Sequence, residues 1–181
     1  MFQYQVKLIE IVQITPIYTQ ELVRWLGYLN SEMYEEPFNE YDNYLVNFTG
    51  NDGLALLDRL NYVTSDGSRI DTIGSNWTTM FNVFYKIGLP YTKLYVGLST
   101  TIPNTTIGLE ETIFHHIYTN PDNWYNEDGE AESVRTVLES ILQPLGAFIF
   151  TYDGSVYITD NNYLMSGSDS MRNFKVFDMQ E

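Results

Sequence analysis

Two adjacent histidines are the residues of this sequence best suited to bind a metal ion or to move a proton. His115 and His116 are its only histidines, and Glu111 lies four positions before His115. On a helix this spacing would place Glu111 and His115 on one face, whereas adjacent residues point about 100° apart. Imidazole and carboxylate groups bind divalent metals, but no third ligand stands at a recognisable spacing. We therefore expect no metal site, and interpret the pair as a surface histidine beside a buried or interfacial one.

Paired carboxyl groups are the second candidate chemistry, because glycosidases use two of them. Acidic doublets occur at Glu35-Glu36 and at Glu110-Glu111. Hydrolysis of a glycosidic bond needs two carboxyls about 5–9.5 Å apart across a sugar, and acidic loops contain such doublets by chance. The sequence has no glycine-rich phosphate loop, nucleophile elbow or ordered Ser/His/Asp set. We expect no catalytic residue, no cofactor and no enzymatic activity.

A third candidate is Asp52, in the segment "GNDGLALLDRL" at residues 50–60. Apolar residues alternate over 44–48, as in a strand, and then recur every three residues up to Leu60, as in a helix. No histidine, lysine or second acid stands near Asp52 to make it reactive. An aspartate at the start of a helix accepts hydrogen bonds from the first free N–H groups. We predict that Asp52 is a helix cap at a strand-to-helix junction.

The segment "AFIFTYDGSVYIT" at 147–159 predicts a β-hairpin with a two-residue type I′ turn at Asp153-Gly154. This register pairs Tyr152 with Ser155 and Phe150 with Tyr157. Both faces are apolar: one carries Ala147, Ile149, Thr151, Val156 and Ile158, and the other carries Phe148, Phe150, Tyr152 and Tyr157. We expect both faces to be covered, by the chain itself or by another chain. The aromatic set is the predicted interaction surface.

Further elements must position these residues. An apolar stripe predicts a helix over 76–88, capped by Ser75 or Asn76, and a second helix begins after Ser133 as its cap. Strands are expected at 3–14 and 92–98, and a strand or short helix around Trp25. From 101 to 132 the pattern weakens, with near-helical spacing between Leu109 and Ile117. Apolar residues at 174–177 suggest a strand with no partner left in the chain.

Together these elements predict an α+β fold, with mixed or antiparallel sheets that form a partial β-barrel and two or three amphipathic helices. We divide the chain into a β-rich region at 1–98, a strand, helix and hairpin region at 99–163, and a linker or truncated further segment at 164–181.

Composition limits the functions that such a fold could serve. The 181 residues include 24 acidic and nine basic side chains, giving a formal net charge of −15. Such a surface repels phosphate backbones, so nucleic-acid binding is disfavoured. No apolar run approaches the ~18 residues of a membrane span, and the absence of cysteine excludes disulfides and thiolate metal sites. Aromatic residues make up 15% of the chain, which favours β-structure or adhesive surfaces.

The order of several segments resembles the central part of bacteriophage and prophage tail-hub (baseplate-hub-like) proteins, particularly those of gut Bacteroidetes. The segments are "WLGYL" at 25–29, "EEPF" at 35–38, "YLVNF" at 44–48, "GNDGLALLDRL" at 50–60, "KIGLP" at 86–90 and "SVRTVLESILQPLGAFIFTYDGSVYIT" at 133–159. The resemblance covers residues 22–160 and is weaker from 101 to 126.

The resemblance implies a structural protein of the virion tail, assembled in the bacterial cytoplasm. Hubs of this kind form a ring, commonly a trimer, and contact other tail proteins; no catalytic residue is implied. A carbohydrate-binding module that stacks aromatic rings on sugars is the alternative, and a tail-associated glycoside or peptidoglycan hydrolase comes third. Neither sequence-specific nucleic acid nor a membrane is an expected partner.

Overall fold

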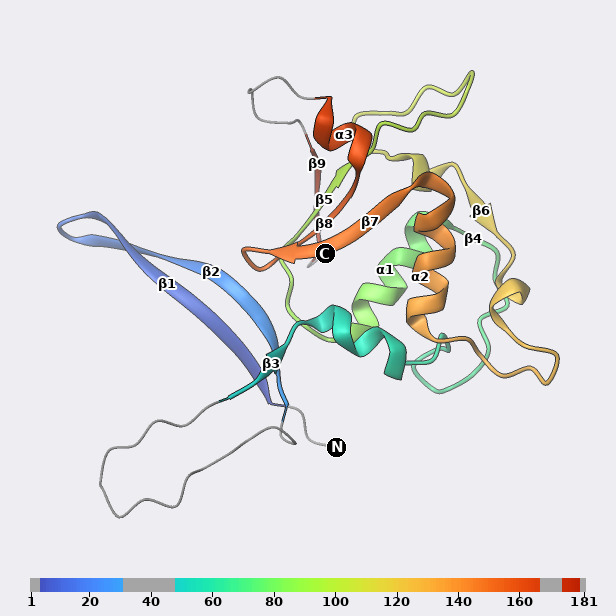
Figure 1. Cartoon of the computed structure of the whole chain (residues 1–181), viewed down its shortest axis with the longest axis horizontal. Helices are drawn as coiled ribbons and strands as arrows, with labels where there is room; N and C mark the ends of the chain where they lie inside the picture. Colours follow the sequence, from blue (N-terminus) through green and yellow to red (C-terminus); the bar gives the residue numbers. More distant parts are fainter. Residues whose placement is uncertain (1–3, 31–47, 167–173, 180–181) are drawn as a thin grey trace, which may run out of the picture.

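The computed structural model describes residues 4–30, 48–166 and 174–179. Its strands are β1 (Gln5–Thr15), β2 (Tyr18–Leu29), β3 (Gly50–Asn51), β4 (Gly74–Ser75), β5 (Lys93–Gly97), β6 (Tyr118–Thr119), β7 (Ala147–Tyr152), β8 (Ser155–Asp160) and β9 (Lys175–Asp178). Its α-helices are α1 (Asn76–Ile87), α2 (Val134–Leu142) and α3 (Asn161–Met165), and its 3₁₀ helices are η2 (Gly53–Arg59), η3 (Ile113–His115), η4 (Pro121–Trp124) and η5 (Gln143–Leu145). The predicted α+β class is confirmed. The described sheets are mixed or antiparallel and are not closed into a barrel (Figure 1).

A four-stranded mixed sheet, in the order β7-β8-β5-β9, is the centre of the body. β8 and β5 run parallel, and the other two pairs are antiparallel. The predicted hairpin register is confirmed, because Tyr152 pairs with Ser155 and Phe150 with Tyr157. Asp153 and Gly154 have φ angles of 47° and 68°. Both values lie in the left-handed region that a type I′ turn requires.

The core lies between one face of this sheet and the helices α1 and α2. Val156 and Ile158 of β8 and Leu94 of β5 are fully buried there. The helices contribute their apolar stripes, consisting of Met80, Val83, Phe84, Ile87, Val134, Val137, Leu138, Ile141 and Leu142. The apolar stripes predicted from the sequence are therefore the faces with which α1 and α2 cover the sheet.

The predicted helix caps are present. Ser75 and Ser133 accept hydrogen bonds from the N–H groups of Thr78 and Thr136 at the starts of α1 and α2. Asp52 caps η2, where Oδ1 accepts from Ala55 N at 3.2 Å, although this segment is a 3₁₀ helix. Asp52 Oδ2 also accepts from the Thr151 hydroxyl at 3.1 Å. The junction is therefore tied to β7.

β1 and β2 form a long antiparallel ribbon, here called the arm (Gln5–Leu29), which projects away from the body (Figure 1). Its base is fixed, because Leu26 and Tyr28 are buried in the core. The Tyr28 hydroxyl donates to Ile87 O at 2.7 Å, and Gln5 Nε2 donates to Gly88 O at 2.9 Å. The segment around Trp25, expected as a strand or a short helix, is a strand.

The expectation that residues 174–177 form a strand without a partner is wrong. β9 pairs antiparallel with β5, with Tyr95 opposite Val176 and Leu94 opposite Phe177. The central sheet thus takes strands from all three regions into which we divided the chain. No short-range pattern predicts this pairing, because β5 and β9 are far apart in the chain.

The segment with near-helical spacing from Leu109 to Ile117 contains only the short helix η3. Lys175 of β9 donates from Nζ to Gly108 O at 2.7 Å and to Glu111 O at 2.5 Å. Gly108 O also accepts from Glu111 N at 3.2 Å, so a single turn here is joined to β9 by the Lys175 side chain. The strand expected at 44–48 lies mostly outside the described residues. Among the residues that are described, no helix is long and apolar enough to cross a membrane.

Candidate interaction surface

The central sheet has a second face, opposite α1 and α2, which carries the predicted aromatic set. Phe148, Phe150 and Tyr152 alternate along β7, and Tyr157 lies beside Phe150 on β8. Because paired residues share a face, the register adds Tyr95 of β5 and Val176 of β9. We call this surface the outer face; with Phe174, next to β9, it comprises Tyr95, Phe148, Phe150, Tyr152, Tyr157, Phe174 and Val176.

The rings of the outer face stack on one another across the strands. The Tyr95 and Tyr157 ring centroids are 4.5 Å apart with planes at 6°, and those of Phe150 and Tyr157 are 5.1 Å apart at 10°. Phe174 meets Tyr157 edge-on at 5.8 Å. Parallel rings on neighbouring strands stand upright on the sheet, since neighbouring strands are only about 4.8 Å apart. They therefore present their edges to solvent and their faces to each other.

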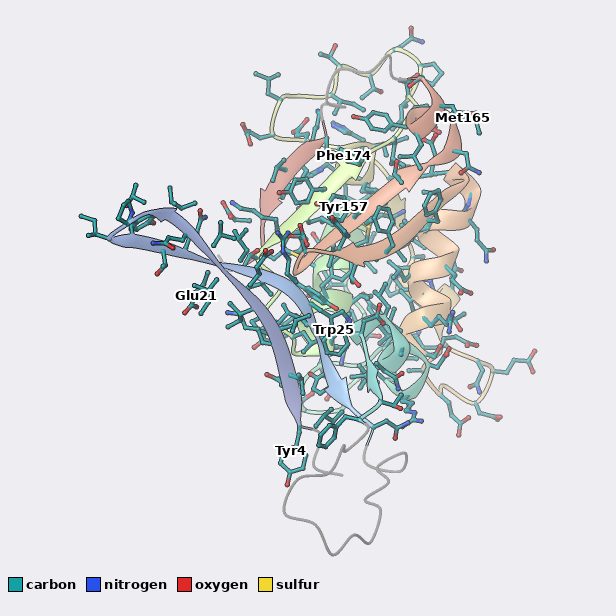
Figure 2. All side chains as sticks on the ribbon, turned by 60° about the vertical axis from the view of Figure 1, so that its left-hand side comes forward. Tyr4, Glu21, Trp25, Tyr157, Met165 and Phe174 are labelled. Atoms are coloured by element: carbon teal, nitrogen blue, oxygen red, sulfur yellow. The ribbon has the colours of Figure 1, made fainter. Side chains whose placement is uncertain are left out.

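One corner of the outer face is closed by α3. A Cβ atom on Gly97 would lie 2.3 Å from Tyr163 Cε1 and 2.8 Å from Phe174 Cδ1, so these rings cover β5 where it has no side chain. α3 itself begins at Asp160, whose carboxylate accepts from Tyr163 N at 2.7 Å. The rest of the face, including Tyr157, is turned toward the viewer in Figure 2.

The two faces of the hairpin differ in burial. The face with Val156 and Ile158 is buried by the chain's own helices, as expected. On the outer face Tyr152 is 62% exposed, and Phe148 and Phe150 remain more than one third exposed. Within the described parts of the chain this face is therefore only partly covered. Burial raises the pKa of Tyr157, and nearby Tyr95 adds to this effect, so the hydroxyl stays neutral near pH 7.

The arm is the second apolar surface. Exposed apolar side chains lie on both of its faces and at its tip: Leu8, Ile9, Ile11, Ile14, Ile17 and Tyr18. Ile17, in the turn between the strands, is 99% exposed, and Ile11 is 67% exposed. Exposed apolar area on this scale is characteristic of contact surfaces.

The arm leaves the body at the tip of the β7–β8 hairpin. Arg24 Nη1 lies 2.8 Å from Asp153 Oδ2, and Arg24 Nε donates to Glu10 Oε2 at 2.6 Å. These two carboxylates raise the pKa of Arg24, Glu10 more than Asp153. Val23 packs against Gly154, where a Cβ atom would lie 2.7 Å from Val23 Cγ1. The root of the arm and the edge of the outer face are therefore adjacent.

The two histidines have different neighbours. Trp77 stacks on the His115 ring at 4.3 Å, and His115 Nδ1 accepts from Thr112 N at 2.9 Å. Burial lowers the pKa of His115, which favours the neutral ring. His116 Nε2 lies 3.0 Å from Glu111 Oε2. No group of three or more histidine, aspartate or glutamate side chains in the described residues is arranged to hold a metal ion.

Of the two acidic doublets, Glu110-Glu111 is the one that lies in the described chain. Glu111 accepts from Gly108 N at 3.1 Å, and this bond, followed by that to His116, lowers the pKa of Glu111. Glu110 is exposed. Glu35 and Glu36 lie outside the described residues.

Sequence reasoning identified four members of the outer face and missed Tyr95, Phe174 and Val176. Alternation within "TKLYVGL" does place Tyr95 on one side of its strand, but only the pairing of β5 with β8 and β9 decides which side. Comparisons with protein-family models, with curated proteins and with solved structures found no match.

Proposed function

We propose that this chain is a structural component of a bacteriophage tail, of the tail-hub or baseplate-hub type, and that it works through contacts with other copies and other tail proteins. The observation that carries the proposal is the pair of exposed apolar surfaces, the arm and the outer face. The order of segments that resembles tail hubs, from residue 22 to 160, points to the same class.

The arm is the stronger of the two structural arguments. An isolated two-stranded ribbon is marginally stable in water at best. The distal arm nevertheless carries Ile11, Ile14 and Ile17 in exposed positions. Burial of apolar area contributes about 25 cal/mol per Å², so a partner that covers these side chains would stabilise the arm. In a larger assembly each subunit always has such a partner.

A carbohydrate-binding module is the second candidate, and the exposed aromatic rings of the outer face favour it. Stacking on a sugar requires a ring that turns its flat face to the ligand. Tyr95, Phe150 and Tyr157 instead place their faces against each other. This arrangement offers ring edges and apolar rims, which suit contact with another protein better than they suit a sugar.

A tail-associated hydrolase comes third. A hydrolase would hold two acids opposite each other across a cleft. An open hollow of about 600 Å³ lies beside the C-terminal end of α1. Its lining consists of Phe81, Asn82, Phe84, Tyr85, Gly88, Leu89, Pro90, Tyr91 and Met179, with no acidic residue among them.

Assembly in a tail also gives a role to the net charge of −15. An acidic surface does not retain DNA that passes along it, and it keeps unassembled chains apart in the bacterial cytoplasm. The proposed partners are therefore proteins, including further copies in a ring such as a trimer, and the proposed location is the virion tail.

The proposal is tested with an antibody raised against the purified chain. Tail-bearing particles released from the source bacterium after prophage induction are purified, labelled with gold and imaged. Label at the end of the tail is the expected result. Antibody that has been absorbed with the pure chain serves as the control. Purified tails without label, when the chain is present in the same lysate, would contradict a virion role.

A further inference from the structure

We infer that the arm of one copy lies over the outer face of a second copy of this chain. The inference deepens the proposed function and rests on it, because it names the two surfaces through which a self-assembling chain makes contact. The occupant of the outer face is then a segment of the same sequence, the ribbon β1–β2.

The arm cannot serve its own outer face. Its base is fixed by buried Leu26 and Tyr28, and by the contact of Val23 with Gly154. Both views show the tip of the arm far from the body (Figures 1 and 2). None of the described residues of the body therefore covers the apolar tip, which is held where another molecule can reach it.

The distribution of charge favours contact between two copies through the arm and the outer face. Two chains of net charge −15 repel each other over most of their area. The arm is an exception, because Lys7 and Arg24 balance Glu10 and Glu21. The charged pair on the outer face, Lys93 with Asp178, is also neutral overall. Arm and outer face are thus two neutral, apolar surfaces on a strongly acidic molecule.

The areas also agree. β7 and β8 have six residues each, β5 has five and β9 has four. At about 4.8 Å between strands and ~3.3 Å per residue, the outer face measures roughly 330 Å². The arm, at roughly 36 Å long, can span that face. Two copies that exchange arms then each bury roughly 650 Å², close to the ~800 Å² that one partner usually contributes to a stable interface.

The root of the arm lies beside one end of the outer face. Val23 packs there against Gly154, in the turn that ends the outer face. An arm that arrives from a second copy therefore extends an apolar surface that the first copy's own arm begins. The contact buries the edges of the upright rings, which their mutual stacking leaves exposed.

The test uses the absence of cysteine in the chain, which makes any introduced thiol unique. One pool carries Ile11→Cys on the arm, and a second pool, with an affinity tag, carries Phe150→Cys on the outer face. The pools are mixed and treated with a short bismaleimide. Because the two thiols are on different molecules, a product that joins them reports only contact between copies.

The matched control replaces Phe150→Cys by Leu109→Cys, since Leu109 is exposed but belongs to neither surface. We expect the Ile11–Phe150 product to exceed the Ile11–Leu109 product at least about tenfold, because docking raises the effective concentration of the two thiols. We also expect Ile11→Glu, in an exposed position where folding is not at stake, to reduce the self-associated fraction at least about tenfold, since it places an unpaired charge in an apolar contact.

Each failure has a distinct meaning. If the wild-type chain self-associates but the Ile11–Phe150 product stays at the level of the control, the inference is overturned and the proposed function is not. A dominant Ile11–Ile11 product, from contact between two arms, would overturn it in the same way. A wild-type chain that remains a monomer would remove the basis of both.

Discussion

At the scale of single residues, Asp160 connects three parts of the structure. It ends β8 and begins α3, and its carboxylate accepts from Ser99 N at 2.6 Å and from Tyr163 N at 2.7 Å. The Ser99 hydroxyl adds a bond at 2.9 Å. Burial alone would raise the pKa of Asp160, but together these hydrogen bonds lower it. The ionised form is therefore the one that the fold stabilises.

Replacement of Asp160 by Asn should lower the free energy of unfolding by about 1–3 kcal/mol at pH 7, because two partly buried N–H groups lose their charged acceptor. Urea denaturation measures this. Asp71→Asn is the control, since the exposed pair that Asp71 makes with Arg69 is worth ~1 kcal/mol or less.

The same substitution predicts how the stability difference between wild type and variant depends on pH. A lowered folded-state pKa adds stability above the unfolded-state pKa of about 3.9. This stability is lost as the pH falls through the folded-state value. The difference between wild type and Asp160→Asn should thus be constant from neutral pH to about 5 and shrink below about 4. A difference that grows on acidification would contradict the assignment.

Ser133 gives a second prediction at this scale. Its hydroxyl accepts from Thr136 N at 3.1 Å, at the start of α2, and Ala at this position should cost about 1 kcal/mol in the free energy of unfolding. Ser133→Asp keeps the acceptor and should cost little. Urea denaturation measures both variants. If Ser133→Ala and Ser133→Asp lower the free energy of unfolding equally, the capping hydrogen bond is not the cause of the loss.

At the scale of elements, the arm and the hairpin meet at Gly154. Its φ of 68° strains any other residue, and a Cβ atom there would lie 2.7 Å from Val23 Cγ1. We expect Gly154→Ala to lower the free energy of unfolding by about 2–3 kcal/mol, from backbone strain plus overlap. Gly129 has a φ of 80° and no neighbour within 4 Å of such a Cβ, so Gly129→Ala should show the strain alone.

Thermal or urea unfolding of both variants, each also in a Val23→Ala background, separates the two causes. The excess cost of Gly154→Ala should shrink when Val23 is shortened, and the cost of Gly129→Ala should not change. If Val23→Ala does not reduce the excess cost of Gly154→Ala in the free energy of unfolding, then the root of the arm does not pack against the hairpin.

Elements defined by local periodicity were predictable from the sequence. The helix beginning after Ser75, the helix beginning after Ser133, and the hairpin with its register follow from caps, apolar spacing and turn residues. The pairings of β5 with β8 and β9 were not predictable, because they join segments that no short-range pattern connects. For the same reason only the β7–β8 part of the outer face was identified, and the contacts of Lys175 with the segment near Glu111 were missed.

At the scale of the whole molecule, like charge and apolar contact oppose each other. At low ionic strength the net charge of −15 repels a second copy, while the screening length falls from about 30 Å at 0.01 M salt to about 8 Å at 0.15 M. We therefore expect added NaCl to strengthen self-association, as seen by static light scattering. Dissociation on addition of salt would show that ion pairs, and not the apolar surfaces, hold the copies together.

We propose that the outer face and the arm meet between copies of the chain. Sedimentation velocity over a concentration series measures this contact for the wild-type chain, for Phe150→Ser on the outer face and for Leu109→Ser as an exposed control. We expect wild type and Leu109→Ser to rise above the monomer mass of 21.0 kDa with concentration, while Phe150→Ser stays near it. A wild-type chain that remains at 21.0 kDa at every concentration would contradict contact between copies through these surfaces.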